Sequence, residues 1–512
     1  MYPFKFLKSI LKSALRGIGN DPEIKKISHK FPKTTDFLKD RFTPDEKFGL
    51  HLTIGLIISS IFAYLFVSLL YGFFTQDVFV LSDLRILNII KTLREESLTQ
   101  VMLFVTTLGD KLVIFSGIFL VSLFFILIKR WRYLVTILAS TFFGEIFIWA
   151  MKHLVERKRP PLSVALIQED GFSFPSGHAF MAMAFYGLIG YFVFRRVRSK
   201  TFKVLVVLLF ALLIIIISFS RLYLGVHWPS DVLASLTAGL AWISVFITAL
   251  EIRRQFKSLT KEKIGWRVSQ VKIIGLSLLA LWILSAIFSW QYLLKRDYRS
   301  LPSQKQSLSI NLPRENFSQK LFLGLPRVSE TISGKAQEPI NVIFLGSKEQ
   351  LQKAFTEAHW LECDRIRASS LKKMTVALIF KTPYPTAPGI PSLWNTMPND
   401  LAFQKPTPNN SIRERNHVHF WKTPFLIDGK ESIWFGTAHF DQTIKESPLF
   451  FLPTHTIDPA IDREREKIKE DLLSAKDVNF LEELQVLEPT LGKNQVGDPF
   501  FTDGKAVILE AR

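Results

Sequence analysis

Seven long apolar runs between Gly49 and Leu294 constrain this chain more than any other feature of its sequence. A helix needs about 20 apolar residues to cross a bilayer, and the runs approach or exceed that length. We therefore expect an all-α transmembrane helical bundle, followed from about residue 299 by a soluble α+β domain. The expected spans are Leu50–Phe74, Leu112–Ile128, Tyr133–Met151, Ala179–Phe194, Val204–Phe219, Val232–Leu250 and Ile273–Leu293.

Basic residues between the apolar runs orient these spans. Lys and Arg gather in the N-terminal segment, between spans two and three, between spans four and five, and between spans six and seven. Short loops rich in Lys and Arg mark the cytoplasmic side of a membrane. The segments 75–111, 152–178 and 220–231 and everything after Leu294 then lie outside. We expect amphipathic helices at the membrane interface within segment 75–111.

The composition excludes two alternatives. The net charge of +19 is also typical of nucleic-acid-binding proteins. Here, however, much of the excess lies in short loops beside apolar runs, so we expect no nucleic-acid partner. One cysteine, Cys363, excludes an intrachain disulfide.

The first group of polar residues lies just after the third span. Lys152 and Arg159 are seven residues apart, so on a continuous helix they would share a face about 10 Å apart. Two such cations can grip different oxygens of one phosphoryl group. Taken alone, the pair is more typical of basic anchors at the end of a membrane helix.

The second group is Pro175-Ser176-Gly177-His178, directly before the fourth span. Ser176 and Gly177 can offer main-chain N–H groups to an anion at a helix N-terminus. His178 can protonate a leaving oxygen. The simpler alternative is an ordinary helix start.

The third group is Ser220-Arg221, followed by His227 and Asp231. Four residues separate His227 from Asp231, which predicts one helical face at the start of the sixth span. A carboxylate on one imidazole nitrogen fixes the tautomer and leaves the other nitrogen free to attack. Arg221 adds a cation for the oxygens of a phosphoryl group. A purely structural His–Asp pair is the alternative.

Together the three groups resemble the type 2 phosphatidic acid phosphatase (PAP2) superfamily. Its pattern is Lys-x6-Arg-Pro, then Pro-Ser-Gly-His, then Ser-Arg-x5-His-x3-Asp, and this sequence matches all three in order. The resemblance implies a six-helix core, to which this chain adds one further span. We expect four parts: a basic cytoplasmic segment 1–48, a PAP2-like core 49–250, a loop and last transmembrane helix 251–298, and an extracytoplasmic domain 299–512.

The resemblance also implies roles for the residues. His227 would be the nucleophile, Asp231 would orient it, and His178 would protonate the leaving group. The phosphate would be held by Lys152, Arg159, Ser176, Gly177 and Arg221. Members of the superfamily act on lipid phosphates and diphosphates without a metal, so no cofactor is expected.

We therefore expect a multi-pass inner-membrane phosphatase acting through a phosphohistidine at the extracytoplasmic face. The expected substrates are undecaprenyl diphosphate, phosphatidic acid, phosphatidylglycerophosphate or a lipid A phosphate. Two alternatives stay open: a lipid phosphotransferase using the same site, and a non-enzymatic protein that binds or transports phospholipids.

The region after Arg299 mixes strand-like and helix-like patterns. We expect strands at Ile340–Leu345, Met374–Phe380, His417–Trp421 and Ser432–Ala438, and helices at Lys348–His359 and Ile461–Ala475. Segments such as Trp434-Phe435-Gly436-Thr437-Ala438-His439 resemble the C-terminal domain known as LssY. That resemblance implies no activity, and we expect the domain to bind an envelope partner or a substrate.

Four of the ten histidines fall close together in this region: His417, His419, His439 and His455. His417 and His419 alternate across Val418, so on a strand both point to one face. With Asp441, Asp458 or Asp462 they could form a metal site. The alternative is a polar cluster that stabilises the fold.

Overall fold

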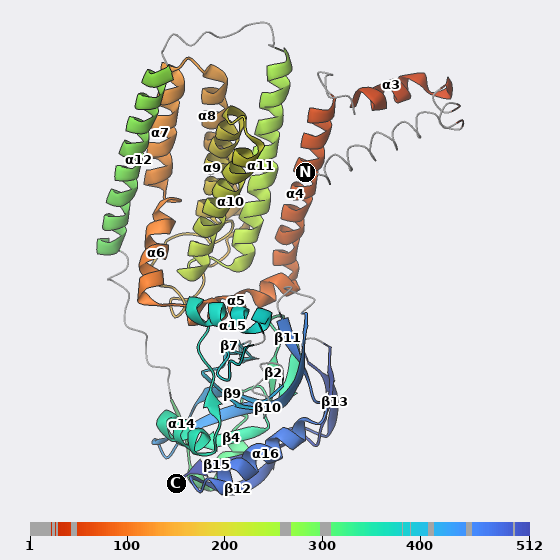
Figure 1. Ribbon diagram of the computed structural model, residues 1–512, viewed down its shortest axis with the longest axis vertical. Helices are drawn as coiled ribbons and strands as arrows, with labels where there is room; N and C mark the ends of the chain where they lie inside the picture. Colours follow the sequence, from red (N-terminus) through yellow and green to blue (C-terminus); the bar gives the residue numbers. More distant parts are fainter. Residues whose placement is uncertain are drawn as a thin grey trace.

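The computed structural model comprises a helical bundle and a strand-rich domain beyond one end of it (Figure 1). The structure describes residues 29–41, 49–256, 268–296, 309–380, 382–389, 391–407, 414–446, 453–494 and 497–512, with the isolated positions 22 and 26. A short helix, α3 (Pro32–Arg41), precedes the bundle.

Six of the described helices are long and apolar enough to span a membrane. They are α4 (Leu50–Thr75), α8 (Trp131–Val155), α9 (Gly177–Arg196), α10 (Lys200–Tyr223), α11 (Pro229–Phe256) and α12 (Val268–Arg296). The helices α6 (Glu96–Thr107) and α7 (Lys111–Leu127) form a pair bent by 47° that can count as one further span. The seven predicted spans are therefore confirmed as apolar helices, and the second of them corresponds to the α7 arm of the bent pair.

Helix α9 forms the centre of the bundle. Its aromatic residues Phe180 and Phe185 are buried among side chains of α7, α8, α10 and α11. By contrast, α4, α10 and α12 expose long apolar side chains such as Leu56, Leu208 and Leu284. An exposed apolar surface of this kind is suited to lipid, in which backbone polar groups must be satisfied inside helices.

Helix α5 (Val78–Thr92) lies across the end of the bundle that faces the strand-rich domain (Figure 1). Asp77 caps it by accepting a hydrogen bond from the Val78 amide. This confirms the predicted helical pieces in segment 75–111. Helix α3 and the basic turn between α7 and α8 lie at the opposite end.

The strand-rich domain contacts α5 directly. Arg85 forms an ion pair with Glu330 at 2.6 Å, and the Asn88 amide donates to the carbonyl of Thr396 at 2.8 Å. Asn88 is buried, whereas a further ion pair between the two regions, from Arg367, is exposed. The contact therefore centres on one face of α5.

The domain is built around a nine-stranded mixed sheet of order β12-β15-β4-β10-β9-β8-β5, with β1 beside β9 and β11 beside β10. Its strands are β1 (Ile310–Leu312), β4 (Val342–Leu345), β5 (Leu361–Glu362), β8 (Leu401–Pro406), β9 (Arg415–Ile427), β10 (Glu431–Glu446), β11 (Pro453–Ile457), β12 (Val478–Gln485) and β15 (Lys505–Ala511). Smaller sheets contain β2 (Val328–Glu330), β3 (Ala336–Pro339), β6 (Leu393–Trp394) and β7 (Met397–Pro398), and β13 (Thr490–Lys493) with β14 (Pro499–Thr502).

The described part of the domain also contains five short helices, of which α14 and α16 pack against the nine-stranded sheet. The five are η1 (Arg314–Asn316), α13 (Phe317–Lys320), α14 (Lys348–Glu357), α15 (Ala368–Phe380) and α16 (Ile461–Ser474). The two predicted helices correspond to α14 and α16, and three of the predicted strands correspond to β4, β9 and β10.

The predicted strand Met374–Phe380 is wrong, because this segment belongs to helix α15. Met374 and Ala377 pack together against Tyr384 and Ala387. Residues three apart share one face of a helix but point to opposite faces of a strand. A short apolar run does not distinguish these two structures by its pattern alone.

Candidate active site

The three polar groups found in the sequence meet at the end of the bundle beside α5. They lie at the end of α8 and in the loop 156–176, at the start of α9, and from the end of α10 through the following turn to the start of α11. Bundle geometry explains the meeting, because α8 and α10 end on the side where α9 and α11 begin.

His227 lies at the centre of this region with 1% of its surface exposed. Its Nδ1 is 3.6 Å from Oδ2 of Asp231. Asp231 is held in turn by the Trp228 amide at 3.0 Å and by the hydroxyl of Ser173. The expectation of a shared helical face is wrong in detail, since α11 begins at Pro229 and His227 lies in the preceding turn. The imidazole nevertheless keeps one nitrogen toward the carboxylate.

Arg159 lies on the other side of the imidazole. Its Nη1 is 3.3 Å from Nε2 of His227 and donates to the Val226 carbonyl at 2.8 Å. The expected continuous helix from Lys152 to Arg159 is wrong, because α8 ends at Val155 and Glu156 has a positive φ of 48°. Pro160 also disfavours helical backbone at Arg159.

A carboxylate bridges the two arginines of the region. Glu169 forms ion pairs with Arg159, at 3.0 Å, and with the fully buried Arg221. Carbonyls of Asp170 and Gly171 also accept hydrogen bonds from Arg159. Oxygen atoms of the loop 156–176 thus contact Arg159 and Arg221, the two cations at which a phosphate group is expected.

The other predicted residues surround this centre. Lys152 donates to the Phe172 carbonyl, and the charges of Arg159, Arg221 and Asp231 act on its ammonium group. Ser176 is the N-cap of α9, and Gly177 is its first residue. The amides of a first helical turn have no intrahelical partner, so they face outward from the helix end.

His178 lies in the same first turn and packs against a glycine. A Cβ at Gly109 would be 3.0 Å from Cδ2 of the His178 ring. Among the described residues, no hydrogen bond joins His178 directly to His227, Arg159 or Arg221. The structure therefore brings His227, Asp231, Arg159 and, through Glu169, Arg221 into one chain of contacts, with the remaining predicted residues around it.

Sequence reasoning missed a buried ionic network behind Asp231. Arg157 donates to Oδ1 of Asp231 at 2.6 Å, to Ser230 at 2.7 Å and to Asp83 of α5 at 2.6 Å. Ser230 also donates to Asp83. A signal was present in the sequence, because the segment Lys152–Arg159 is rich in Lys and Arg although it is expected on the extracytoplasmic side.

The surroundings of His227 determine its protonation. Burial lowers the pKa of His227 well below its usual value. The positive charges of Arg159 and Arg221 lower it further, whereas the Asp231 carboxylate acts to raise it. A neutral imidazole is the form that can act as a nucleophile.

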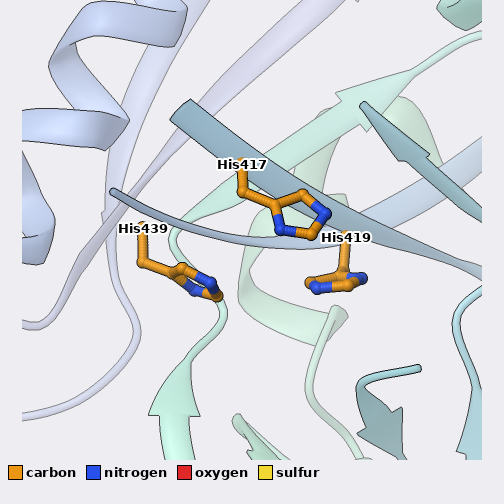
Figure 2. Close-up of side chains that lie close together, drawn as sticks. All are labelled: His417, His419 and His439. Atoms are coloured by element: carbon orange, nitrogen blue, oxygen red, sulfur yellow. The ribbon is translucent and has the colours of Figure 1, made fainter. Parts of the chain in front are cut away.

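A second candidate site lies in the C-terminal domain, where His417, His419 and His439 point toward a common space (Figure 2). Each offers a nitrogen within 4.8 Å of the others. Of the three carboxylates expected to complete a metal site, Asp441 lies 3.5 Å from Nδ1 of His417. The side chain of His455 lies outside the described residues.

The three imidazoles differ in protonation. Burial lowers the pKa of His417 to about 4 and that of His419 well below its usual value. Burial also acts to lower the pKa of His439, but Glu338 and Asp441 outweigh it and raise this pKa to about 10. The carboxylates therefore favour the protonated form of His439, whereas burial favours the neutral form of the other two rings.

Comparison with known proteins matches both halves of the chain to families. A model described as the PAP2 superfamily matches residues 129–255, and one described as LssY C-terminus matches residues 323–506. Phosphatidylglycerophosphatase B of Bacillus subtilis (strain 168) is 32% identical over 152 residues, which are 29% of this chain and 73% of that protein. The protein named "Putative undecaprenyl-diphosphatase YbjG" of Escherichia coli (strain K12) is 31% identical over 119 residues, 21% of this chain and 53% of that protein.

Two solved structures are similar to part of the chain. The PAP2 type phosphatidylglycerolphosphate phosphatase from Bacillus subtilis is 25% identical with a TM-score of 0.31, covering 39% of this chain and all (100%) of that one. LpxE of Aquifex aeolicus is 21% identical with a TM-score of 0.25, covering 32% of this chain and 94% of that one.

Proposed function

Because this chain belongs to the PAP2 superfamily and is a membrane phosphatase of that family, we propose that it hydrolyses a lipid phosphate or diphosphate through a phosphohistidine on His227. The observation that carries the proposal is the position of the His227 ring. One nitrogen faces the Asp231 carboxylate at 3.6 Å, and the other lies 3.3 Å from the Arg159 guanidinium. That arrangement is suited to a nucleophile aimed at a bound anion.

In the proposed first step, Nε2 of His227 attacks phosphorus and the bond to the leaving oxygen breaks. Asp231 accepts from the Nδ1–H group and stabilises the positive ring as it forms. His178 gives a proton to the leaving oxygen. In the second step, water attacks the phosphohistidine, which releases inorganic phosphate and frees His227.

Charge stabilisation in this scheme comes from the protein. Lys152, Arg159 and Arg221 neutralise the phosphoryl oxygens, and the amides at the start of α9 add hydrogen-bond donors. Glu169 must leave Arg159 and Arg221 before the phosphate binds, because it forms ion pairs with both. No metal is needed in this scheme, since three side-chain cations already meet the charge.

The relatives support a lipid substrate and narrow the choice. Those named for phosphatidylglycerophosphate and undecaprenyl diphosphate make these two lipids the first candidates. Phosphatidic acid and lipid A phosphate remain as further candidates. The chain is a multi-span membrane protein, and we place it in an inner membrane, with the active site and residues 299–512 outside and the basic turns inside. An envelope partner for the C-terminal domain stays a prediction.

The test is phosphate release by the purified full-length protein from a panel of lipid phosphates and diphosphates in mixed micelles. Rapid acid-free quenching with a ³²P-labelled lipid should trap label on His227, stable to alkali and labile to acid. Release of phosphate without a trapped histidine adduct would contradict the covalent route. Transfer of label to an added alcohol or lipid would instead indicate a phosphotransferase, and binding without turnover a lipid-binding protein.

A further inference from the structure

The C-terminal sheet contains a group of buried histidines that the phosphatase reaction does not use. His417 and His419 lie on one face of β9, and His439 lies directly opposite His417 on β10. Opposite residues in an antiparallel pair have Cβ atoms about 4.5–5.5 Å apart. The strand register therefore fixes the three rings as neighbours, with centroids 4.3, 5.7 and 6.1 Å apart.

We propose that His417, His419 and His439 bind a divalent transition metal ion of the zinc class. Each ring presents a nitrogen within 4.8 Å of the other two (Figure 2). In a tetrahedral zinc site with bonds of about 2.0–2.1 Å, ligand nitrogens are about 3.3 Å apart. The nitrogens must therefore move closer together by side-chain rotation when the cluster closes around an ion.

Burial argues against a merely polar cluster. Only 3%, 4% and 9% of His417, His419 and His439 is exposed, and no described residue gives Nδ1 of His419 a hydrogen-bond partner. Buried polar atoms are normally paired, and an unpaired one costs about 1–3 kcal/mol. A metal ion would supply the missing partner.

Carboxylates behind the rings fit the same assignment. Asp441 is fixed by Arg415 at 3.0 Å and lies 3.5 Å from Nδ1 of His417 and 3.4 Å from Nε2 of His439. Glu338 lies 3.4 Å from Nδ1 of His439. Metal-bound histidines commonly donate their second N–H group to a carboxylate. Such acids orient the rings and offset the charge of a dication.

Three imidazole ligands determine which metal ions the site favours. They also leave one coordination position of the ion open. Three imidazoles favour zinc, copper, nickel or cobalt over calcium and magnesium, which prefer oxygen. The backbone at Gly389 closes over the rings, because a Cβ there would lie 2.6 Å from Cε1 of His417. Three protein ligands leave the fourth tetrahedral position to water or a small anion.

The test uses full-length protein purified through a tag without histidine, stripped with EDTA, desalted and incubated with zinc chloride alone. After free metal is removed, elemental analysis should find about one zinc per chain. Cobalt chloride in its place should give the visible absorption of a tetrahedral site. The exposed histidine at the end of α14 provides the matched control, His359→Asn, which should bind zinc as the wild type does.

Two variants test the assignment. His419→Ala should lose about 100-fold or more in zinc affinity, and Glu338→Gln about 10–100-fold while the stoichiometry at saturating zinc stays the same. Should His419→Ala not fold, the wild type alone decides, because zinc must raise its melting temperature. Wild-type protein that retains no zinc overturns the proposal, as does equal zinc retention by His419→Ala.

Discussion

The membrane site and the histidine cluster of the C-terminal sheet bury the same side chain in opposite electrostatic surroundings. His227 lies among Arg159 and Arg221, whereas His439 lies beside Glu338 and Asp441. Burial, together with the two arginines, lowers the pKa of His227, and positive surroundings suit an anion. The two carboxylates raise the pKa of His439 against the effect of its burial, and negative surroundings suit a cation. The comparison teaches that the charges around a histidine, more than its burial, indicate which kind of ligand it can serve.

The largest expected effect is the loss of phosphatase activity in His227→Ala. We expect a fall of about 10⁴-fold or more in kcat, because removing a nucleophile removes the covalent route itself. The exposed neighbour variant His153→Ala is the control and should stay close to the wild type. If His227→Ala released phosphate at the wild-type rate, His227 would not be the nucleophile. The contrast between the two histidine environments would then have no bearing on catalysis.

Arg157→Met should have the next largest effect. It leaves Asp83 and Asp231 buried without their cation, which costs about 3–5 kcal/mol of stability, and it should lower kcat about 10–100-fold through a misplaced Asp231. Thermal unfolding in detergent and turnover on one lipid measure the two effects. Arg157→Lys should recover part of both, and a variant as active as the wild type would exclude a positioning role for Arg157.

The pH dependence of kcat/KM tests the positive surroundings of His227. Loss of a neighbouring charge in Arg159→Met should raise the pKa of His227 and shift the acidic limb of the profile to higher pH. Arg159→Lys keeps the charge and should leave the limb near its wild-type position. Ionisation of the substrate is common to all three enzymes and cancels. An identical limb in both variants would mean that Arg159 does not influence His227.

Glu169→Gln should strengthen the binding of anions several-fold. The carboxylate pairs with Arg159 and Arg221, so its removal frees both for phosphate. The vanadate concentration that gives half-maximal inhibition and the KM should both decrease. Glu156→Gln, at an exposed position, should change neither value. A higher KM in Glu169→Gln would show that this carboxylate assists binding instead of competing with it.

The smallest expected effect is that of chelation on catalysis. EDTA should leave phosphate release unchanged, because Lys152, Arg159 and Arg221 supply the charge in the proposed reaction. In the same sample it should lower the melting temperature of the zinc-loaded protein. Phosphatase activity that falls with EDTA and returns with zinc would mean that the two sites form one functional unit.

Much of the membrane site follows from the sequence because a bilayer fixes the length of a helix. Once seven apolar runs are placed, their ends bring Lys152, Arg221 and His227 to one side. The contributions of Glu169 and Asp83 could not be predicted in this way. One lies in an irregular loop and the other on an interfacial helix, and their positions depend on tertiary packing.

The strand-rich domain was predictable in part. Alternation identified His417 and His419 as neighbours, but the place of His439 depends on the register between β9 and β10, which sequence alone does not fix. The strand predicted at Met374–Phe380, which lies in α15, was wrong because this apolar run is short enough to form either a strand or a helix.

Helix α5 carries Asp83 and Arg85 only two residues apart. Asp83 accepts from Arg157 behind the active site, while Arg85 is paired with Glu330 of the C-terminal domain. A helix is too stiff to let positions so close move independently. A displacement of Arg85 by the C-terminal domain would therefore also move Asp83, which accepts from the same guanidinium, that of Arg157, as Asp231 does.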